Sequence, residues 1–200
     1  MSDPTETPRR GRPKTLDRLA VVETTMNAYW EDGPNAVSLN AICQRAGVSK
    51  PSLYREFGND DGLARAALEH YGAKVLGALL SILGGEMPFA DKIRAVAKLA
   101  TGDDVHAHGC LFVKMRAGKR QMGPQTQALI EAMEQAALEA YADALNAAHG
   151  TGEWSGAIPV DLAARYLQEQ IGLALDQRAR GEDAVETLDL ALSVVLGTDR

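Results

Sequence analysis

The chain has 200 residues, of which 46% are hydrophobic and 24% charged, and its formal net charge is −6. That apolar share is enough to bury a core, and the length suits one domain or two small ones. Two cysteines are too few for a disulfide framework and fit a reducing compartment. No apolar run approaches the ~18 residues of a membrane span, and the first residues lack the apolar segment of a secretory signal. We therefore expect a cytoplasmic protein with no membrane partner.

The charge is spread unevenly along the chain. Residues 1–55 carry eight Lys and Arg against six Asp and Glu, a net charge of +2, whereas residues 56–200 carry −8. A basic N-terminal part on an acidic body predicts a small module that faces an anion, attached to a larger portion with another task.

The N-terminal part begins with a polar arm and an amphipathic helix. Residues 1–15 are rich in Pro and Arg and show no periodicity, which predicts a flexible arm. Apolar residues then recur at intervals of three and four over residues 16–31, the period of a helix. The turn residues DGPN at 32–35 are expected to end that helix.

Two more short helices follow, separated by a glycine. Ser38 can cap the first, and Gly47 can end it because glycine tolerates the left-handed conformation at a helix C-terminus. Ser49 can cap the second, in whose first turn Pro51 removes no intrahelical hydrogen bond. This arrangement predicts a helix-turn-helix whose second helix presents its start to the major groove of DNA. An ordinary helical corner with solvated polar residues is the alternative.

The residues of this segment resemble a known signature. The run AICQRAGVSKPSLYREF at 41–57, followed by GNDDGL at 58–63, is similar to the DNA-binding motif of the TetR family of one-component transcriptional regulators. The similarity covers about residues 16–65, and the rest agrees only in length and helical layout. It favours a DNA-binding regulator, most often a repressor in this family, over the helical corner.

The resemblance also implies which residues contact DNA. Ser38 and Tyr54 are expected to contact phosphates, with Arg45 as a further backbone candidate, and the start of the third helix is expected to approach bases. At Asp60 the family usually has a lysine that pairs with phosphate, and this sequence lacks that lysine. Cations of the arm can compensate by entering a narrow minor groove, unless the arm is only a solubilising tail. The full set of expected DNA contacts is Arg10, Arg12, Lys14, Ser38, Arg45, Ser49, Lys50, Pro51, Ser52, Tyr54 and Arg55.

The remaining pattern predicts six further helices and no strand. The first of them becomes apolar all round toward its end, which is typical of a buried helix. We expect an all-α protein of about nine helices: a flexible basic arm at 1–15, a three-helix DNA-binding domain at 16–60, and a helical domain at 61–200 that the resemblance makes a ligand-binding and dimerisation domain. The expected ranges are about 60–83, 88–101, 109–120, 124–148, 159–181 and 184–197.

The last two predicted helices carry extended apolar seams. Such seams pack helix against helix, either within one chain or between two. The resemblance favours a homodimer built from these two helices, and two-fold symmetry then predicts a palindromic operator. The seam residues are Tyr166, Leu167, Ile171, Ala174, Val185, Leu188, Leu192 and Val195.

The resemblance further implies a chamber for a small-molecule effector between the fourth and eighth helices. Plain core is the alternative role for most of its candidate residues. The candidates are Tyr71, Val75, Leu79, Phe89, Leu99, Cys110, Phe112, Met115, Met133 and Tyr141.

Cys110 has two alternative roles. It stands at a predicted helix start behind Gly109, close to His106 and His108, so the helix dipole and protonated imidazoles would lower the thiol pKa and make the residue reactive. A buried, inert cysteine is the alternative. The two histidines and the cysteine also have the composition of a metal site, although a spacing of two splays ligands on a helix and leaves only a loop geometry.

Enzymatic function is not indicated. The motifs GxGxxG, GxxxxGK[ST], HExxH and GxSxG are absent, so we expect no catalytic residues and no cofactor. We expect a regulator that leaves its palindromic operator when an effector binds the larger domain. The alternative is a helical ligand- or metal-binding sensor that does not act through DNA.

Overall fold

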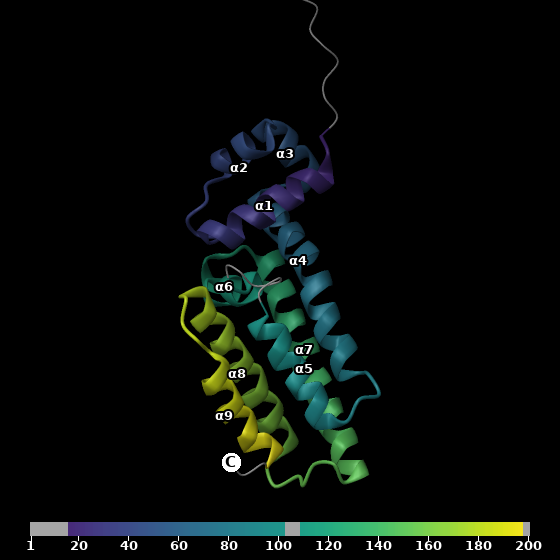
Figure 1. Ribbon diagram of the computed structural model, residues 1–200. Coiled ribbons are helices and arrows are strands. Elements are labelled where there is room, and N and C mark those ends of the chain that lie inside the picture. Colours follow the sequence, from purple (N-terminus) through teal and green to yellow (C-terminus); the bar gives the residue numbers. More distant parts are fainter. Residues whose placement is uncertain (1–15, 103–108, 198–200) are drawn as a thin grey trace, which may run out of the picture.

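Helices make up all of the regular structure in residues 16–102 and 109–197, the parts of the chain that the computed structural model describes (Figure 1). Within these ranges there are nine α-helices, one short 3-10 helix and no strand, so the predicted all-α fold is confirmed. The helices are α1 (Arg18–Asp32), α2 (Leu39–Ala46), α3 (Lys50–Phe57), α4 (Asp60–Leu83), α5 (Phe89–Thr101), α6 (Leu111–Ala117), η1 (Lys119–Gln121), α7 (Pro124–Thr151), α8 (Val160–Ala179) and α9 (Val185–Leu196).

Local capping sets the bounds of α2 and α3. Ser38 accepts a hydrogen bond from the backbone N–H of Ala41 at 3.2 Å, and Ser49 accepts one from that of Ser52 at 3.3 Å. Gly47 follows α2 with a φ of +65°, a left-handed conformation that is costly for residues with a Cβ. The two short helices therefore begin and end where the sequence predicts.

One apolar side chain from each motif helix anchors the pair to the helices beneath. Ile42 of α2 and Leu53 of α3 are fully buried, in one apolar cluster with Val21 of α1 and Leu63 of α4. Burying such a side chain stabilises the fold by about 1.5–3 kcal/mol. Packing beneath the turn therefore holds α2 and α3 in a helix-turn-helix.

The long helix α4 joins this motif to the rest of the molecule. It has 24 residues and runs from the motif down the length of the body (Figure 1). The apolar cluster beneath the motif continues through Tyr71 of α4 to Met115 of α6 and Ile130 of α7. The division that the sequence predicts between residues 60 and 61 thus falls at the start of a helix that packs with both parts. Neither α4 nor any other helix in the described ranges has the length and apolar character needed to cross a membrane.

A second apolar cluster fills the body between α5, α7, α8 and α9. Trp154 closes one end of it and donates a hydrogen bond from Nε1 to the backbone oxygen of Val195 at 2.8 Å. Leu188, Leu192 and Val195 of α9 are only 2%, 3% and 2% exposed. The prediction of a subunit seam is wrong for these three residues, because they pack against helices of their own chain.

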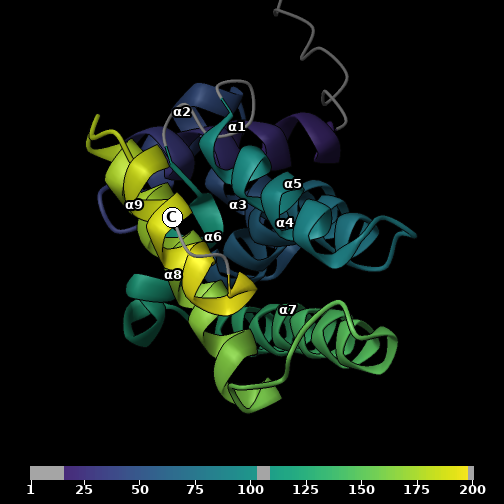
Figure 2. The same ribbon diagram turned by 60° about the horizontal axis from the view of Figure 1, so that its bottom comes forward.

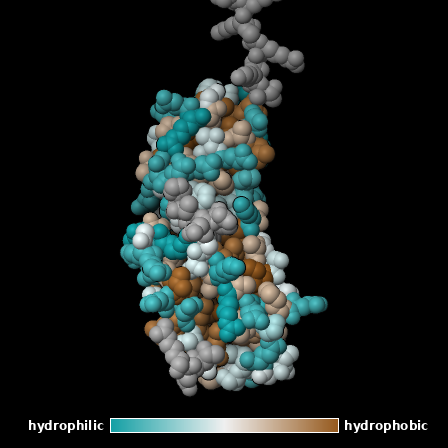
Figure 3. Space-filling view, in the orientation of Figure 1, coloured by the Kyte–Doolittle hydropathy of each residue, from teal (hydrophilic) through white to brown (hydrophobic). Residues whose placement is uncertain are grey.

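The outer side of α8 and α9 nevertheless exposes apolar side chains. Leu162, Leu173, Leu190 and Val194 are 57%, 43%, 53% and 54% exposed, and we call these four residues the outer apolar face. Figure 2 shows α8 and α9 side by side along one flank of the body, with α4 on the opposite flank. Apolar side chains, in brown, are visible at the surface of the lower half of the molecule in Figure 3.

Candidate DNA interface and effector cavity

The start of α3 lies at one end of the molecule and carries residues that the resemblance assigns to DNA (Figure 1). Lys50, Pro51 and Arg55 are exposed there, and Tyr54 is half-buried. The Lys50 Nζ lies 5.3 Å from the centroid of the Tyr54 ring, within the range of a cation–π contact. An ammonium group and a phenol hydroxyl thus stand together, and both can contact phosphates or base edges.

The serines around this surface make local hydrogen bonds. Ser49 donates from its hydroxyl to Ser52 Oγ at 2.9 Å. Ser38 is exposed, and the bond from the Ala41 amide uses its oxygen as an acceptor, which leaves its O–H group as a donor. Ser38 is therefore suited to donate to a phosphate while it caps α2.

Arginines tie α1 to the motif helices. Arg45 is exposed but ion-paired, with Nη2 2.6 Å from Asp32 Oδ2, so a phosphate must compete with that carboxylate. Arg18, which was not predicted to belong to this surface, lies 5.3 Å from the Phe57 ring centroid and 3.3 Å from Glu56. Only the folded arrangement brings Arg18 to α3, since nothing in its local sequence marks it. The predicted arm contacts Arg10, Arg12 and Lys14 lie outside the described residues.

Two carboxylates at the start of α4 have different surroundings. Asp60, which stands where the resemblance implies a lysine, is exposed. Asp61 instead accepts hydrogen bonds from the backbone amides of Gln125 and Thr126 and from the Thr126 hydroxyl. Partial burial raises the pKa of Asp61, but these hydrogen bonds outweigh it and hold the pKa below its usual range.

A cavity of about 100 Å³ lies within the body, between α4, α5, α6, α7 and α8. Seven of the predicted effector residues line it: Val75, Leu79, Leu99, Cys110, Phe112, Met133 and Tyr141. Its remaining wall is formed by Leu76, Val96, Ala100, Val113, Arg116, Ala137, Gln168, Ile171, Gly172 and Leu175.

Three of the predicted effector residues are not in this wall. Tyr71 packs edge-on against Trp30, with ring centroids 5.9 Å apart, and Met115 is fully buried beneath the motif. Phe89 packs against Trp154 in the other apolar cluster, with ring centroids 6.5 Å apart. All three are core residues, which the apolar pattern alone cannot distinguish from cavity lining.

The eighth helix was predicted to border the chamber, but none of its residues was among the predicted lining residues. Ile171 was assigned to a subunit seam, yet it lines the cavity together with Gln168 and Gly172. A Cβ at Gly172 would lie 3.5 Å from Nη2 of Arg116, an ordinary contact distance, so the guanidinium lies beside this part of α8.

The surroundings of Cys110 favour the inert alternative over the reactive one. The side chain is only 4% exposed and precedes a helix of seven residues. Burial raises the pKa of the Cys110 thiol, and hydrogen bonds from Tyr71 and the backbone amides of Val113 and Phe112 offset this only in part. Cys110 is thus a buried, protonated thiol in the cavity wall. His106 and His108 lie outside the described residues.

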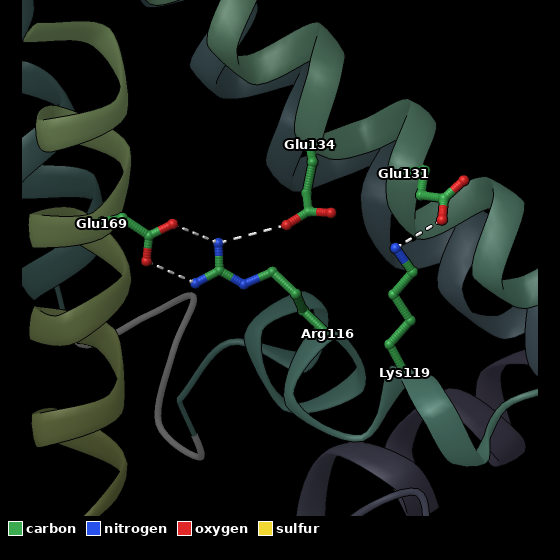
Figure 4. Close-up of polar contacts among 5 residues, drawn as sticks. All are labelled: Arg116, Lys119, Glu131, Glu134 and Glu169. Atoms are coloured by element: carbon green, nitrogen blue, oxygen red, sulfur yellow. Dashed lines mark hydrogen bonds and ion pairs between the residues drawn. The ribbon is translucent and has the colours of Figure 1, made fainter. Parts of the chain in front are cut away.

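Arg116 ties three helices together at the edge of the cavity (Figure 4). Its Nη1 and Nη2 donate to the two carboxylate oxygens of Glu169 on α8, at 3.1 and 3.2 Å. Glu134 of α7 lies 3.7 Å from Nη1. Nearby, Lys119 Nζ is 2.7 Å from Glu131 Oε1, a second contact to α7. The charge of Arg116 is therefore neutralised by carboxylates outside the cavity wall.

Direct hydrogen bonds connect the cavity region to α1. Trp30 donates from Nε1 to the backbone oxygen of Gly109 at 2.7 Å, and Lys114 Nζ donates to the backbone oxygen of Trp30 at 2.5 Å. Gly109 directly precedes Cys110 in the cavity wall. These two hydrogen bonds join the start of α6 and the residue before the cavity wall to the end of α1. In the described part of the chain, no group of three or more His, Cys, Asp or Glu side chains is placed to hold a metal ion.

Short capped motif helices at the end of an elongated helical body, with a cavity between the helices of that body, define a helix-turn-helix protein with a second, helical domain. Residues 21–67 match the sequence model of the bacterial regulatory proteins of the tetR family. Residues 21–67 therefore carry the sequence signature of the tetR regulatory proteins, and the resemblance read from the sequence is confirmed for that segment.

Curated relatives share part of this sequence, and solved structures share its fold. The HTH-type transcriptional repressor ComR of Escherichia coli is 37% identical over 109 residues, which cover 52% of this chain and 51% of ComR. The match thus spans about half the length of that relative. The reduced form of E. coli NemR has the same fold, with a TM-score of 0.76 and 20% identity over 90% of this chain and 95% of that one. A cysteine mutant of the TetR family regulator CifR, complexed with 26bp double-strand operator DNA, gives a TM-score of 0.74 and 21% identity over 92% of this chain and 100% of that one.

Proposed function

We propose that the chain is a DNA-binding transcriptional regulator, a repressor that leaves a palindromic operator when a small effector occupies the cavity. The observation that carries this proposal is the exposed start of α3, with Lys50 and Tyr54 side by side above a packed helix-turn-helix. A helix start with a cation and hydroxyls is the part of such a motif that enters the major groove. The names of ComR, a repressor, and of CifR, which is complexed with operator DNA, support the same function.

The two halves of a palindrome require two copies of the motif. We place the dimer contact on the outer apolar face of α8 and α9, because isolated monomers rarely expose several large apolar side chains on adjacent helices. A two-fold axis through this face would set two α3 helices side by side for successive major grooves. The internal residues Leu188, Leu192 and Val195 support the face from behind.

Effector binding must favour one spacing of the two motifs over the other. Two connections can carry that bias from the cavity to the motif. One runs from α6 through Gly109 to Trp30 at the end of α1. The other runs from α7 through Thr126 to Asp61 at the start of α4. The first connection joins the segment before α6 to α1, and the second joins α7 to α4.

The test begins with selection of tight binders from randomised duplexes, followed by measurement of affinity against salt. We expect a palindromic consensus. Replacing Lys50 by Ala should lower the affinity and flatten the slope of log K on log salt by about 0.9 for each phosphate that the variant no longer neutralises. Lys74→Ala is the matched control, because Lys74 is exposed on α4 away from the motif. Equal effects of the two substitutions would reject the assignment, and a cavity ligand without any duplex binding would favour a sensor that does not act on DNA.

A further inference from the structure

The polar groups in the cavity wall limit which molecules can occupy it. Of the described residues that line it, only Cys110, Arg116, Tyr141 and Gln168 carry polar side-chain atoms. The others are apolar residues or glycine, from all five surrounding helices. An occupant must therefore be mostly apolar, and the four polar groups decide its charge and its hydrogen bonds.

Arg116 is the one charged side chain in the described part of the wall, and its charge is already matched. Glu169 accepts two hydrogen bonds from it, and Glu134 lies 3.7 Å away (Figure 4). An anionic ligand would meet a cluster of one cation and two carboxylates, with a net charge of −1. A cationic ligand would enter an apolar chamber with no carboxylate in its described wall. The cavity is therefore built for a neutral molecule.

Gln168 provides an unused hydrogen-bond acceptor. Its Oε1 is buried and has no partner among the described residues. A buried carbonyl oxygen without a partner is costly and rare in folded proteins, and such groups call for an explanation such as a bound ligand. Cys110, by contrast, shares a hydrogen bond with Tyr71.

Tyr141 adds a second polar group to the wall. Burial alone raises the pKa of Tyr141, and no hydrogen bond contributes to that shift. At neutral pH its hydroxyl is thus a neutral group that can donate to or accept from a ligand.

The volume of the cavity sets the size of the occupant. A cavity of about 150 Å³ lined by apolar side chains binds benzene. The cavity here measures about 100 Å³ and is partly open, so it suits a molecule of about the size of one six-membered ring, or an aliphatic chain of similar volume.

We propose that the effector is a small, neutral, mostly apolar molecule with one hydrogen-bond donor, such as a phenol or a short alcohol, and that Gln168 Oε1 accepts its hydrogen bond. This inference rests on the proposed function of the cavity as an effector site. It assigns Gln168 as the residue that distinguishes such a donor from a plain hydrocarbon.

The experiment compares three probes of similar shape on the full chain by titration calorimetry at neutral pH. Phenol is neutral and has a donor, benzene is neutral without one, and benzoate is an anion. We expect phenol to bind about three- to tenfold more tightly than benzene, the effect of one net hydrogen bond, and benzoate to bind least. Equal binding of phenol and benzene, tightest binding of benzoate, or binding of none of the three would each overturn the proposal.

A matched pair of substitutions tests the role of Gln168. Gln177, also on α8, has a buried Oε1 without a partner among the described residues, but it does not line the cavity. Gln168→Met should remove the preference for phenol over benzene, and Gln177→Met should retain it. Because both changes remove an unpaired buried oxygen, neither should lower the melting temperature, which shows that the variants fold. A preference retained in Gln168→Met, or abolished in both variants, would overturn the assignment.

The two proposals fail in different ways. These titrations contain no DNA, so the absence of a phenol preference in a protein that still binds its duplex would remove only the ligand class. Phenol binding by a protein that binds no selected duplex would support the ligand class and reject the regulator.

Discussion

Asp61 at the start of α4 caps the N-terminus of α7 by way of Thr126. The Asp61 Oδ1 accepts hydrogen bonds from the Thr126 hydroxyl at 2.6 Å and from its backbone N–H at 3.0 Å, while Oδ2 accepts from the Gln125 N–H at 2.9 Å. A Cβ on Gly123, which precedes α7, would lie 2.3 Å from the Asp61 carboxyl carbon, so only glycine allows this approach. One carboxylate thus fixes the helix that follows the DNA-binding motif to a helix of the cavity wall.

Asp61→Asn should therefore destabilise the protein. The loss of a charged cap at a helix N-terminus typically costs about 1 kcal/mol. The folded state lowers the pKa of Asp61, so its contribution is complete above the unfolded pKa of ~3.9 and disappears as the pH falls through the lower folded value. Urea unfolding of wild type and variant from pH 3 to pH 7 measures this, and the difference should shrink at the acid end.

The neighbouring Asp60→Asn is the control for this prediction. Asp60 is exposed in the same first turn of α4, so its carboxylate has the same favourable position at the N-terminus of the helix dipole. The substitution Asp60→Asn should change the free energy of unfolding far less than Asp61→Asn does. Equal losses from the two substitutions would show that only the general charge of this turn matters.

The position of Asp60 also gives a prediction about DNA binding. The family resemblance implies a phosphate-binding lysine at this position, so Asp60→Lys should tighten duplex binding and steepen the slope of log K on log salt by about 0.9. Glu86→Lys changes the net charge equally, at an exposed position beyond the far end of α4. Duplex affinity measured at several salt concentrations separates a direct phosphate contact from a general effect of net charge. An equal increase in affinity in Glu86→Lys would indicate the general effect alone.

The outer apolar face predicts a specific pattern of dissociation. Leu190→Glu should yield monomers with unchanged helix content, because its side chain is 53% exposed in the monomer but would place an unpaired charge in a dimer contact. Leu19→Glu, at a residue 54% exposed on α1, should leave the mass in solution unchanged. Analytical ultracentrifugation distinguishes the two. A dimer that persists in Leu190→Glu would show that the dimer contact lies on another surface.

Capping and periodicity explain how much of this fold the sequence predicts. Ser38, Gly47 and Ser49 act on their own neighbours within a few residues, so the bounds of α2 and α3 can be read locally. Periodicity also shows that Leu188 and Leu192 share one side of α9. It does not show what that side packs against, which is why an internal core was predicted as a subunit seam.

The cavity was harder to predict because its wall is assembled from five helices that are distant in sequence. Apolar residues such as Val75 and Met133 were found, since they lie on the inner faces of long amphipathic helices. Gln168 and Arg116 were missed, because a polar residue in a helix is ordinarily read as solvated. Only the three-dimensional arrangement shows the Gln168 oxygen to be buried without a partner among the described residues and the Arg116 charge to be matched from α7 and α8.

Cys110 provides the last prediction. Because burial raises its thiol pKa, alkylation should be slow at neutral pH and should not release DNA. Cys43 is half-buried on α2 and is the internal reference. The protein is alkylated at a series of pH values, and mass spectrometry of tryptic peptides measures the labelling of each cysteine. Cys43 should be labelled first, and Cys110 only well above the unperturbed thiol pKa of ~8.5 or on unfolding. Faster labelling of Cys110 than of Cys43 at pH 7, with loss of duplex binding that Cys110→Ser prevents, would show a reactive thiol in place of an inert cavity residue.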